Sequence, residues 1–266
     1  MRTLLFFLVA LFLIKGDAFA ENAKIASLVV DVNRLKVLHQ KNAREKRYPA
    51  SLTKMMTLYL TFDALKNKKI GFNTKIPISK AAALQKPSKL YLKPGETITV
   101  QEAINALIIK SANDVAYALA EKLGNGSLEN FILLMNKKAK KLGMQSTTFA
   151  NPHGWHDPKQ YTTAYDMAKL AIALRKYHPQ YFKLFSSKSF TFKGKKIKTY
   201  NRVLLSCHEV DGIKTGFTNA AGFNLVTSVK NKKANIVAVI LGENSSQERD
   251  KKMLNLIKPY LGKEIA

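Results

Sequence analysis

The sequence predicts an α+β fold in which N- and C-terminal segments form one antiparallel five-stranded sheet, with helices packed on it and a helical lobe inserted between the segments. Strand-like stretches occur at both ends of the chain, and apolar residues recur with a helical period through the middle. The chain has 266 residues, of which 46% are apolar, so it can bury one large core. No repeat or low-complexity linker divides it, and we expect a single domain over residues 21–266.

Residues 1–20 differ in composition from the rest and predict a secretory signal peptide. A short basic start precedes an apolar run over residues 4–14, and the small residues Ala18 and Ala20 lie near a cleavage point before Glu21. The run is too short to span a bilayer comfortably, although an uncleaved membrane anchor is the alternative interpretation. In both cases we expect the folded domain outside the cytoplasm.

Two strands and then a series of helices are expected after the signal peptide. The strands cover residues 25–32 and 35–40 and are separated by a turn at Asn33 and Arg34. Residues 71–98, with two prolines and a Pro-Gly turn, are expected to be irregular. The period of the apolar residues predicts the helices. They span residues 51–65, 99–110, 113–124, 128–142 and 164–177.

From Ser189 onward the sequence is β-like, with short apolar segments between turn residues. The expected strands span residues 189–194, 195–200, 210–216, 222–230 and 234–242. A final helix over residues 246–261 has an apolar side that can pack on the sheet. These strands follow the helical region, so the sheet must combine the first and last segments of the chain.

The chain is strongly basic, with a formal net charge of +26. This charge predicts attraction to anionic surfaces such as phosphate-bearing wall polymers, acidic lipids or nucleic acid. The lysines are dispersed in pairs and are not gathered in one arm interleaved with aromatic residues. This dispersion favours a solvated basic exterior over a nucleic-acid groove, and no nucleic-acid partner is expected.

Disulfides, metals and other cofactors are not expected. Cys207 is the only cysteine, which excludes an intramolecular disulfide and a cysteine-based metal site. His153, His156 and Asp157 share one loop, but no further histidine or acidic residue keeps a regular ligand spacing with them.

Ser51 and Lys54, at the start of the first predicted helix, are the first candidates for catalysis. Their spacing places both side chains on one helical face. A serine hydroxyl is a poor nucleophile until a base removes its proton, and a lysine can be that base only where burial or a second cation lowers its pKa. A capping serine followed by a surface lysine has the same spacing, so the pair needs a convergent cation to support it.

Two further polar motifs could complete such a site. Ser111 and Asn113 interrupt two apolar helical stretches, where they could cap a helix or present a hydroxyl and an amide to a substrate. Lys214 would supply the second cation, Thr215 a donor to a carboxylate, and Gly216 room for a substrate backbone along the strand. An ordinary strand end with a turn glycine would give the same triplet.

The three motifs occur in the order found in penicillin-binding proteins and class A β-lactamases. Agreement extends over nearly all of residues 25–260, in the stretches YPASLTKMMT, SAND, NPHGWHDPKQYTTAYDMAKLA, DGIKTGFTNAAGFNLVTSV and VAVILGENSSQERDKKML. The chain resembles the low-molecular-mass penicillin-binding proteins that act as D-alanyl-D-alanine carboxypeptidases. This resemblance implies a β-lactamase/transpeptidase-like fold and a serine mechanism without a cofactor.

The resemblance also implies the catalytic roles. Ser51 would be the acylated nucleophile, Lys54 its general base and Ser111 a proton relay, while Asn113 would bind a peptide carbonyl of the substrate. The backbone N–H groups of Ser51 and Phe217 would form the oxyanion hole, which stabilises the charge that develops in acyl transfer.

The residues implied for carboxylate recognition come from the C-terminal part. Lys214 and Thr215 would engage the terminal carboxylate of the substrate and, with Ser111, protonate the departing D-alanine. Arg202 and Arg249 lie in stretches similar to the family's arginine positions near the carboxylate pocket. A surface salt bridge would look the same in sequence.

We therefore expect an enzyme that removes the terminal D-alanine from peptidoglycan stem peptides and is acylated by β-lactams. A DD-endopeptidase that cuts cross-links is the closest alternative, and these motifs do not separate the two. A class A β-lactamase would carry a glutamate between the second and third motifs, and residues 151–166 contain none. A basic binding module with decayed motifs is the non-enzymatic alternative, against which the intact motifs argue.

Family members often append a β-rich domain and an amphipathic helix that lies on the membrane, whereas only 50 residues follow Gly216 here. We expect a soluble enzyme of the periplasm or cell-envelope space, held near an anionic wall or membrane surface by its charge.

Overall fold

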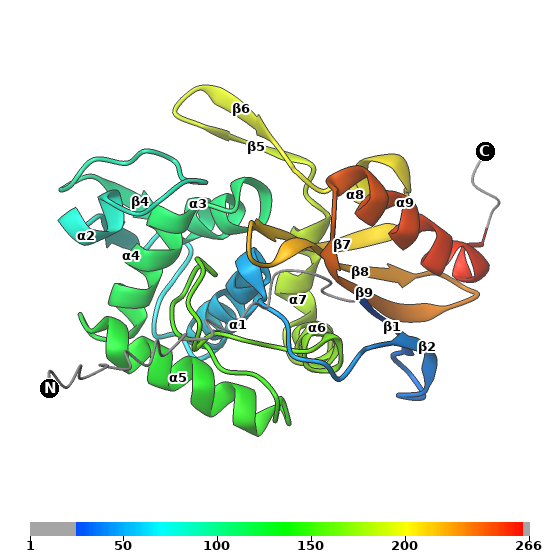
Figure 1. Cartoon of the computed structure of the whole chain (residues 1–266). Coiled ribbons are helices and arrows are strands. Elements are labelled where there is room, and N and C mark those ends of the chain that lie inside the picture. The colour runs from blue at the N-terminus through cyan, green and yellow to red at the C-terminus, as the bar shows by residue number, and fades with distance from the viewer. Residues whose placement is uncertain (1–24, 263–266) are drawn as a thin grey trace, which may run out of the picture.

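The computed structural model describes residues 25–262 and contains one antiparallel sheet of five strands in the order β2-β1-β9-β8-β7 (Figure 1). Strands from both ends of the chain meet where β1 pairs with β9, which confirms the predicted fold class. The strands are β1 Ala26–Asp31, β2 Val37–Lys41, β7 Val210–Thr218, β8 Gly222–Lys230 and β9 Asn235–Glu243. The predicted signal peptide, residues 1–20, lies outside the described residues.

The central strand β9 is buried on both faces, which explains its unbroken apolar sequence. Val239 belongs to the larger core and its neighbour Ile240 to a smaller one on the opposite face. α6 (Ala164–Tyr177) packs against the sheet in the larger core, and α9 (Ser246–Ile257) covers the other face. The sheet is therefore the middle layer of the molecule.

A helical lobe is inserted between β2 and β7, as predicted (Figure 1). α1 (Lys54–Lys66) lies at the centre, between this lobe and the sheet, and nearly all of its side chains are buried. The other helices of the lobe are α2 Lys80–Ala83, α3 Val100–Asn105, α4 Asn113–Leu123 and α5 Leu128–Lys141. A helix buried on every side forms a rigid support for residues at its ends.

Short elements depart from the sequence-based expectation. The stretch expected to be irregular contains β3, α2 and β4, and the C-terminal part is not continuously β, because β5 and β6 form a separate hairpin followed by α8. Segments of three to five residues carry too few positions to reveal a period. They are η1 Ala50–Thr53, β3 Lys75–Pro77, β4 Thr97–Thr99, the π-helix η2 Ala106–Lys110, α7 Pro179–Phe182, η3 Lys183–Ser186, β5 Ser189–Phe192, β6 Lys195–Lys198, α8 Arg202–Ser206 and η4 Lys258–Tyr260.

Within residues 25–262, none of the helices combines the length and the apolar character needed to cross a bilayer.

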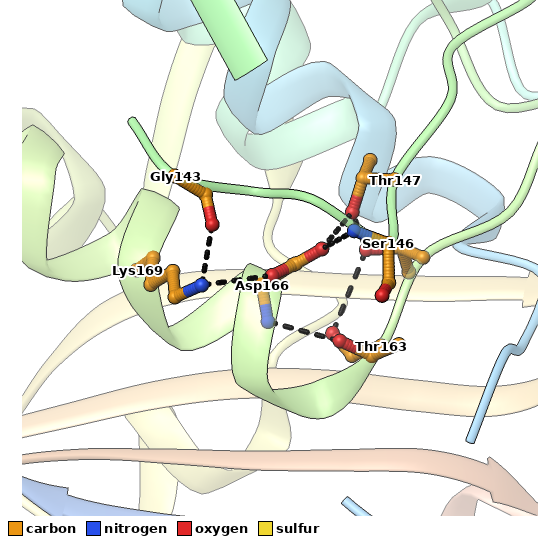
Figure 2. A network of polar contacts seen from close by, with 7 residues as sticks. Gly143, Ser146, Thr147, Thr163, Asp166 and Lys169 are labelled. Atoms are coloured by element: carbon orange, nitrogen blue, oxygen red, sulfur yellow. Dashed lines mark hydrogen bonds and ion pairs between the residues drawn. The ribbon is translucent and has the colours of Figure 1, made fainter. Parts of the chain in front are cut away.

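The loop between α5 and α6, residues 142–163, is held by the buried carboxylate of Asp166 (Figure 2). One carboxylate oxygen accepts hydrogen bonds from the backbone N–H of Ser146 at 2.8 Å and from the hydroxyl of Thr147 at 2.9 Å. The other oxygen lies 3.3 Å from Lys169 Nζ, which is on the surface. Hydrogen bonds to an ionised acceptor are stronger than neutral ones, so this network fixes the loop to the start of α6.

We expect Asp166→Ala to lower the free energy of unfolding by about 2 kcal/mol, because it leaves the partly buried N–H of Ser146 without an acceptor and removes the charged acceptor of the Thr147 hydroxyl. Urea denaturation with an unchanged m-value would measure this loss. Lys169→Ala is the matched control, since it removes the exposed partner of the same carboxylate and should cost less than about 1 kcal/mol. Equal midpoints for Asp166→Ala and the wild-type protein would contradict the assigned role of the carboxylate.

Candidate active site

Ser51 and Lys54 lie at the junction of η1 and α1, in the centre of the molecule. Ser51 is part of the 3₁₀ turn, and Lys54 is the first residue of α1. Although Ser51 lies in a 3₁₀ turn and not in the predicted helix, the two side chains are close together as expected, with 3.0 Å between Lys54 Nζ and Ser51 Oγ. The Lys54 side chain is fully buried, whereas Ser51 is partly exposed, so only the hydroxyl can be reached from solvent.

Two acceptors surround the Lys54 amine besides the hydroxyl. Nζ donates to Asn113 Oδ1 and to the carbonyl oxygen of His153, each at 2.6 Å. The Asn113 amide is oriented by its own NH₂ group, which donates to the carbonyl of Lys86. A neutral amine has two N–H bonds and one lone pair. With both N–H bonds directed at these two acceptors, the lone pair faces the hydroxyl of Ser51, which can donate.

The electrostatic setting favours this neutral form. Burial is the largest cause that lowers the pKa of Lys54 well below its ordinary value, and the nearby charge of Lys214 lowers it further, against the opposing influence of Asp114. The cation that the sequence motifs required is thus in place, and the amine can act as a base toward the hydroxyl.

Ser111 and Asn113 are positioned by an irregular end of a helix. η2 forms a π-helical turn and ends at Ser111, whose backbone is left-handed with φ of 59°. Non-glycine residues rarely adopt this conformation, and both it and π-turns concentrate at functional sites. The Ser111 hydroxyl is buried and has no hydrogen-bond partner among the residues of the structure. It is therefore available for a proton transfer or a ligand.

Asp114 stabilises the backbone next to Ser111 and Asn113. Its buried carboxylate accepts N–H groups of Leu90 at 3.0 Å, Leu92 at 3.4 Å and Val115 at 2.9 Å, which ties residues 88–92 to the start of α4. Burial raises the pKa of Asp114 against the effect of these hydrogen bonds. This tie places the segment of chain before α3 beside Asn113.

β7 brings the third motif to the same place. It is an edge strand of the sheet and lies against η1. At Gly216 an added Cβ would be 3.1 Å from the backbone nitrogen of Ser51, so only glycine allows this approach of two backbones without displacement. Thr215 is partly buried, and Phe217 is exposed, with its ring stacked on Phe223.

Lys214 points into the protein from β7 and is 2% exposed. Its Nζ donates to the carbonyl of Thr215 at 3.0 Å. Burial, followed by the charge of Arg249, lowers the pKa of Lys214 to about 7. Arg249 is itself buried on α9, where its guanidinium pairs with Asp250. Two buried cations thus lie near the Lys54 amine, and cations of this kind can bind a carboxylate.

Arg202 is placed differently from the other predicted residues. It is exposed at the start of α8, and its side chain makes no hydrogen bond or ion pair with the residues in 25–262. Direct hydrogen bonds join Lys54 to Ser51 and Asn113, and Lys214 lies close enough for its charge to influence Lys54. Arg249 influences Lys214 in the same way. The predicted Arg202 does not join this group.

The α5–α6 loop closes the site and was not predicted to contribute. An added Cβ at Gly154, where φ is +91°, would overlap the carbonyl oxygen of Ala50, so the loop lies directly on the backbone that precedes Ser51. His153 contributes its backbone carbonyl to Lys54, and its ring is neutral because burial and Lys54 lower its pKa to about 3. A backbone ligand carries no residue-type signature, which is why sequence patterns miss it.

Comparisons with known proteins identify the relatives of this chain. The D-alanyl-D-alanine carboxypeptidase family model (peptidase family S11) matches residues 17–245. The chain is 40% identical over 254 residues to D-alanyl-D-alanine carboxypeptidase DacC of Escherichia coli, covering 90% of this chain and 63% of that one. It is 36% identical over 252 residues to DacF of Bacillus subtilis, covering 91% and 63%. The chain thus spans less than two thirds of the length of these relatives.

Solved structures give the same result. Penicillin binding protein 5 from Haemophilus influenzae superposes with a TM-score of 0.84 at 34% identity, over 88% of this chain and 69% of that one. Penicillin-binding protein D2 from Listeria monocytogenes, in a cefotaxime-bound form, gives a TM-score of 0.80 at 30% identity, over 87% and 94%. The chain belongs to peptidase family S11, the D-alanyl-D-alanine carboxypeptidases.

Proposed function

We propose that this protein is a serine-type D-Ala-D-Ala carboxypeptidase, which removes the terminal D-alanine from peptidoglycan stem peptides through an acyl-enzyme on Ser51. One observation carries the proposal: the buried amine of Lys54, with a lowered pKa, lies 3.0 Å from the hydroxyl of Ser51. Membership of the family supports the reaction class, and the buried cations Lys214 and Arg249 suit a substrate that ends in a carboxylate.

In the acylation step, Ser51 Oγ attacks the carbonyl carbon between the last two D-alanines while Lys54 takes the hydroxyl proton. The negative charge on the carbonyl oxygen is held by the backbone N–H groups of Ser51 and Phe217. When the peptide bond breaks, the D-alanine nitrogen must gain a proton. Ser111, whose hydroxyl has no other partner in residues 25–262, relays it with the help of Lys214.

In the deacylation step, water attacks the ester carbonyl after transferring a proton to the Lys54 amine, and Ser51 regains its hydroxyl. Lys214 and Thr215 bind the terminal carboxylate of the substrate, and Asn113 holds a peptide group upstream of the scissile bond. Because Lys214 is buried near Arg249, a carboxylate that reaches Lys214 gains a charge-assisted hydrogen bond, which selects peptides with a free C-terminus.

We place the enzyme in the envelope. Residues 1–20 would serve as the secretory signal, and residues 21–266 would form the catalytic domain. The net charge of +26 supports an association with anionic wall or membrane surfaces.

Ser51→Ala should abolish covalent labelling by a fluorescent penicillin and the release of D-alanine from a peptide ending in D-Ala-D-Ala, because no other group replaces the nucleophile. Gel fluorescence and a D-alanine assay would measure the two effects. Ser206→Ala, on the surface of α8, is the control and should behave as wild type. Equal labelling of Ser51→Ala and wild type would refute the assignment.

The pH dependence of kcat/KM should reveal the two buried lysines. Lys54 must be neutral to accept a proton, and Lys214 must be charged to bind the carboxylate, so activity should fall above about pH 7, where Lys214 loses its proton. Lys214→Arg should lower activity but extend it to higher pH, because a guanidinium stays protonated. If the activity of the wild-type protein and of Lys214→Arg falls at the same alkaline pH, a group other than Lys214 controls this decrease.

The penicillin acyl-enzyme should persist for minutes, because residues 151–166 contain no glutamate that could activate a deacylating water as in class A β-lactamases. Intact-protein mass spectrometry after removal of free penicillin would follow the decay. A class A β-lactamase, treated in the same way, provides the control. Loss of the adduct within milliseconds would favour the β-lactamase alternative.

A further inference from the structure

The positive charge of the chain is concentrated in the segment between Asp166 and Glu209. Between Asp166 and Glu209 there is no acidic residue, but there are ten lysines and arginines. Half of these cations are exposed lysines in or directly before the β5–β6 hairpin. They are Lys188, Lys193, Lys195, Lys196 and Lys198.

The hairpin is an ordered element with two distinct faces. Phe190 pairs with Ile197 across the strands, and both side chains pack against the main core, as does the buried Phe192. The pairs Thr191 with Lys196 and Ser189 with Lys198 alternate with these and so occupy the opposite face, whereas the exposed Lys195 pairs with Phe192 on the apolar face, next to the turn. The apolar face therefore anchors the hairpin, while the hairpin itself extends from the body of the molecule (Figure 1).

This hairpin stands at the edge of the active site. β6 lies against η2, the π-helix that ends at Ser111. Directly after β6, the Tyr200 hydroxyl accepts a hydrogen bond from Lys110 at 2.9 Å. At the hairpin turn, Lys193 pairs with Glu96 of the helical lobe at 2.8 Å. The backbone that carries the lysines is therefore held beside the residues of the proposed proton relay.

Four of these charges are not compensated within the protein. Lys193 has its acidic partner, but Lys188, Lys195, Lys196 and Lys198 form no side-chain hydrogen bond or ion pair with any residue of the described chain. Like charges held close together repel one another and raise the local potential, which attracts an anionic partner. A partner with several negative charges along its length would relieve the repulsion of all four.

We propose that the β5–β6 hairpin is a docking element for the peptidoglycan strand that carries the scissile stem peptide. The proposal rests on the proposed function. Each stem peptide ends in a carboxylate, so a strand with many stems is a polyanion whose charges lie at some distance from the cleaved bond. The hairpin binds neighbouring stems while one stem enters the pocket at Lys214.

The character of the hairpin favours this partner over a lipid surface. Peripheral membrane elements combine basic residues with exposed Trp, Phe or Leu that enter the acyl region. The hairpin turn, Lys193 to Lys195, contains no apolar side chain, and the two phenylalanines of β5 lie on the anchored face. Binding to a hydrated polymer that carries carboxylates requires exposed cations and no exposed apolar side chains.

The test uses the triple variant Lys195→Gln, Lys196→Gln, Lys198→Gln. The matched control is Lys137→Gln, Lys140→Gln, Lys141→Gln, which removes three exposed lysines from α5. We expect the hairpin variant to lose about tenfold in kcat/KM on insoluble purified peptidoglycan at low salt, and the loss to shrink in high salt. Its kcat/KM on a short blocked peptide ending in D-Ala-D-Ala, and its penicillin acylation rate, should equal those of the wild-type protein.

A binding measurement keeps this inference separate from the proposed function. Each set of substitutions is also placed in Ser51→Ala, and sedimentation with purified peptidoglycan is measured without catalysis. Reduced sedimentation of the hairpin variant, with the α5 variant unaffected, supports the proposal even if no D-alanine is released by the wild-type protein. Equal sedimentation of both variants overturns it. So does a loss confined to phosphatidylglycerol vesicles, which would assign the hairpin to lipid.

Discussion

The site depends on burying the Lys54 amine beside a second buried cation. Water would stabilise the charged amine, so its exclusion from the first turn of α1 makes the neutral form accessible near neutral pH. Lys214, on a strand more than one hundred residues later in the chain, adds repulsion. Neither effect exists in the unfolded chain. The lowered pKa of Lys54 is thus a product of the tertiary structure, in which the surrounding elements separate the amine from solvent.

Close backbone contacts support the candidate site on both sides of Ser51. Gly216 brings the edge strand β7 onto η1, and Gly154 brings the α5–α6 loop onto the residue before Ser51. The loop also supplies the carbonyl that accepts one N–H of Lys54, and it is anchored in turn by Asp166. A buried lysine with well-placed acceptors is costly in stability but fixed in orientation. Close backbone approaches and one backbone carbonyl therefore help to hold the candidate site in place.

The sequence predicted the sheet from both chain ends and the helical insert because long periodic segments, such as those of α6 and β9, carry a strong pattern. The sequence also pointed to the three motifs whose residues lie around the Lys54 amine. It did not reveal the π-turn before Ser111, the carbonyl of His153 or the capping carboxylate of Asp114. These depend on backbone conformation and on contacts between distant segments, which residue types do not encode individually. Arg202 matched a family stretch, yet its side chain is exposed on α8.

The pairing of β1 with β9 has a consequence for how the molecule acquires its shape. Residues opposite one another in this pair, such as Ala26 and Leu241, are separated by most of the chain. Contacts of such high sequence separation form late, because the entropy of closing a long loop must be overcome first. Lys214 reaches the amine only when β7 and its neighbours join this sheet. We therefore expect a chain that lacks the last strands to lack the buried pair of Lys54 and Lys214 as well.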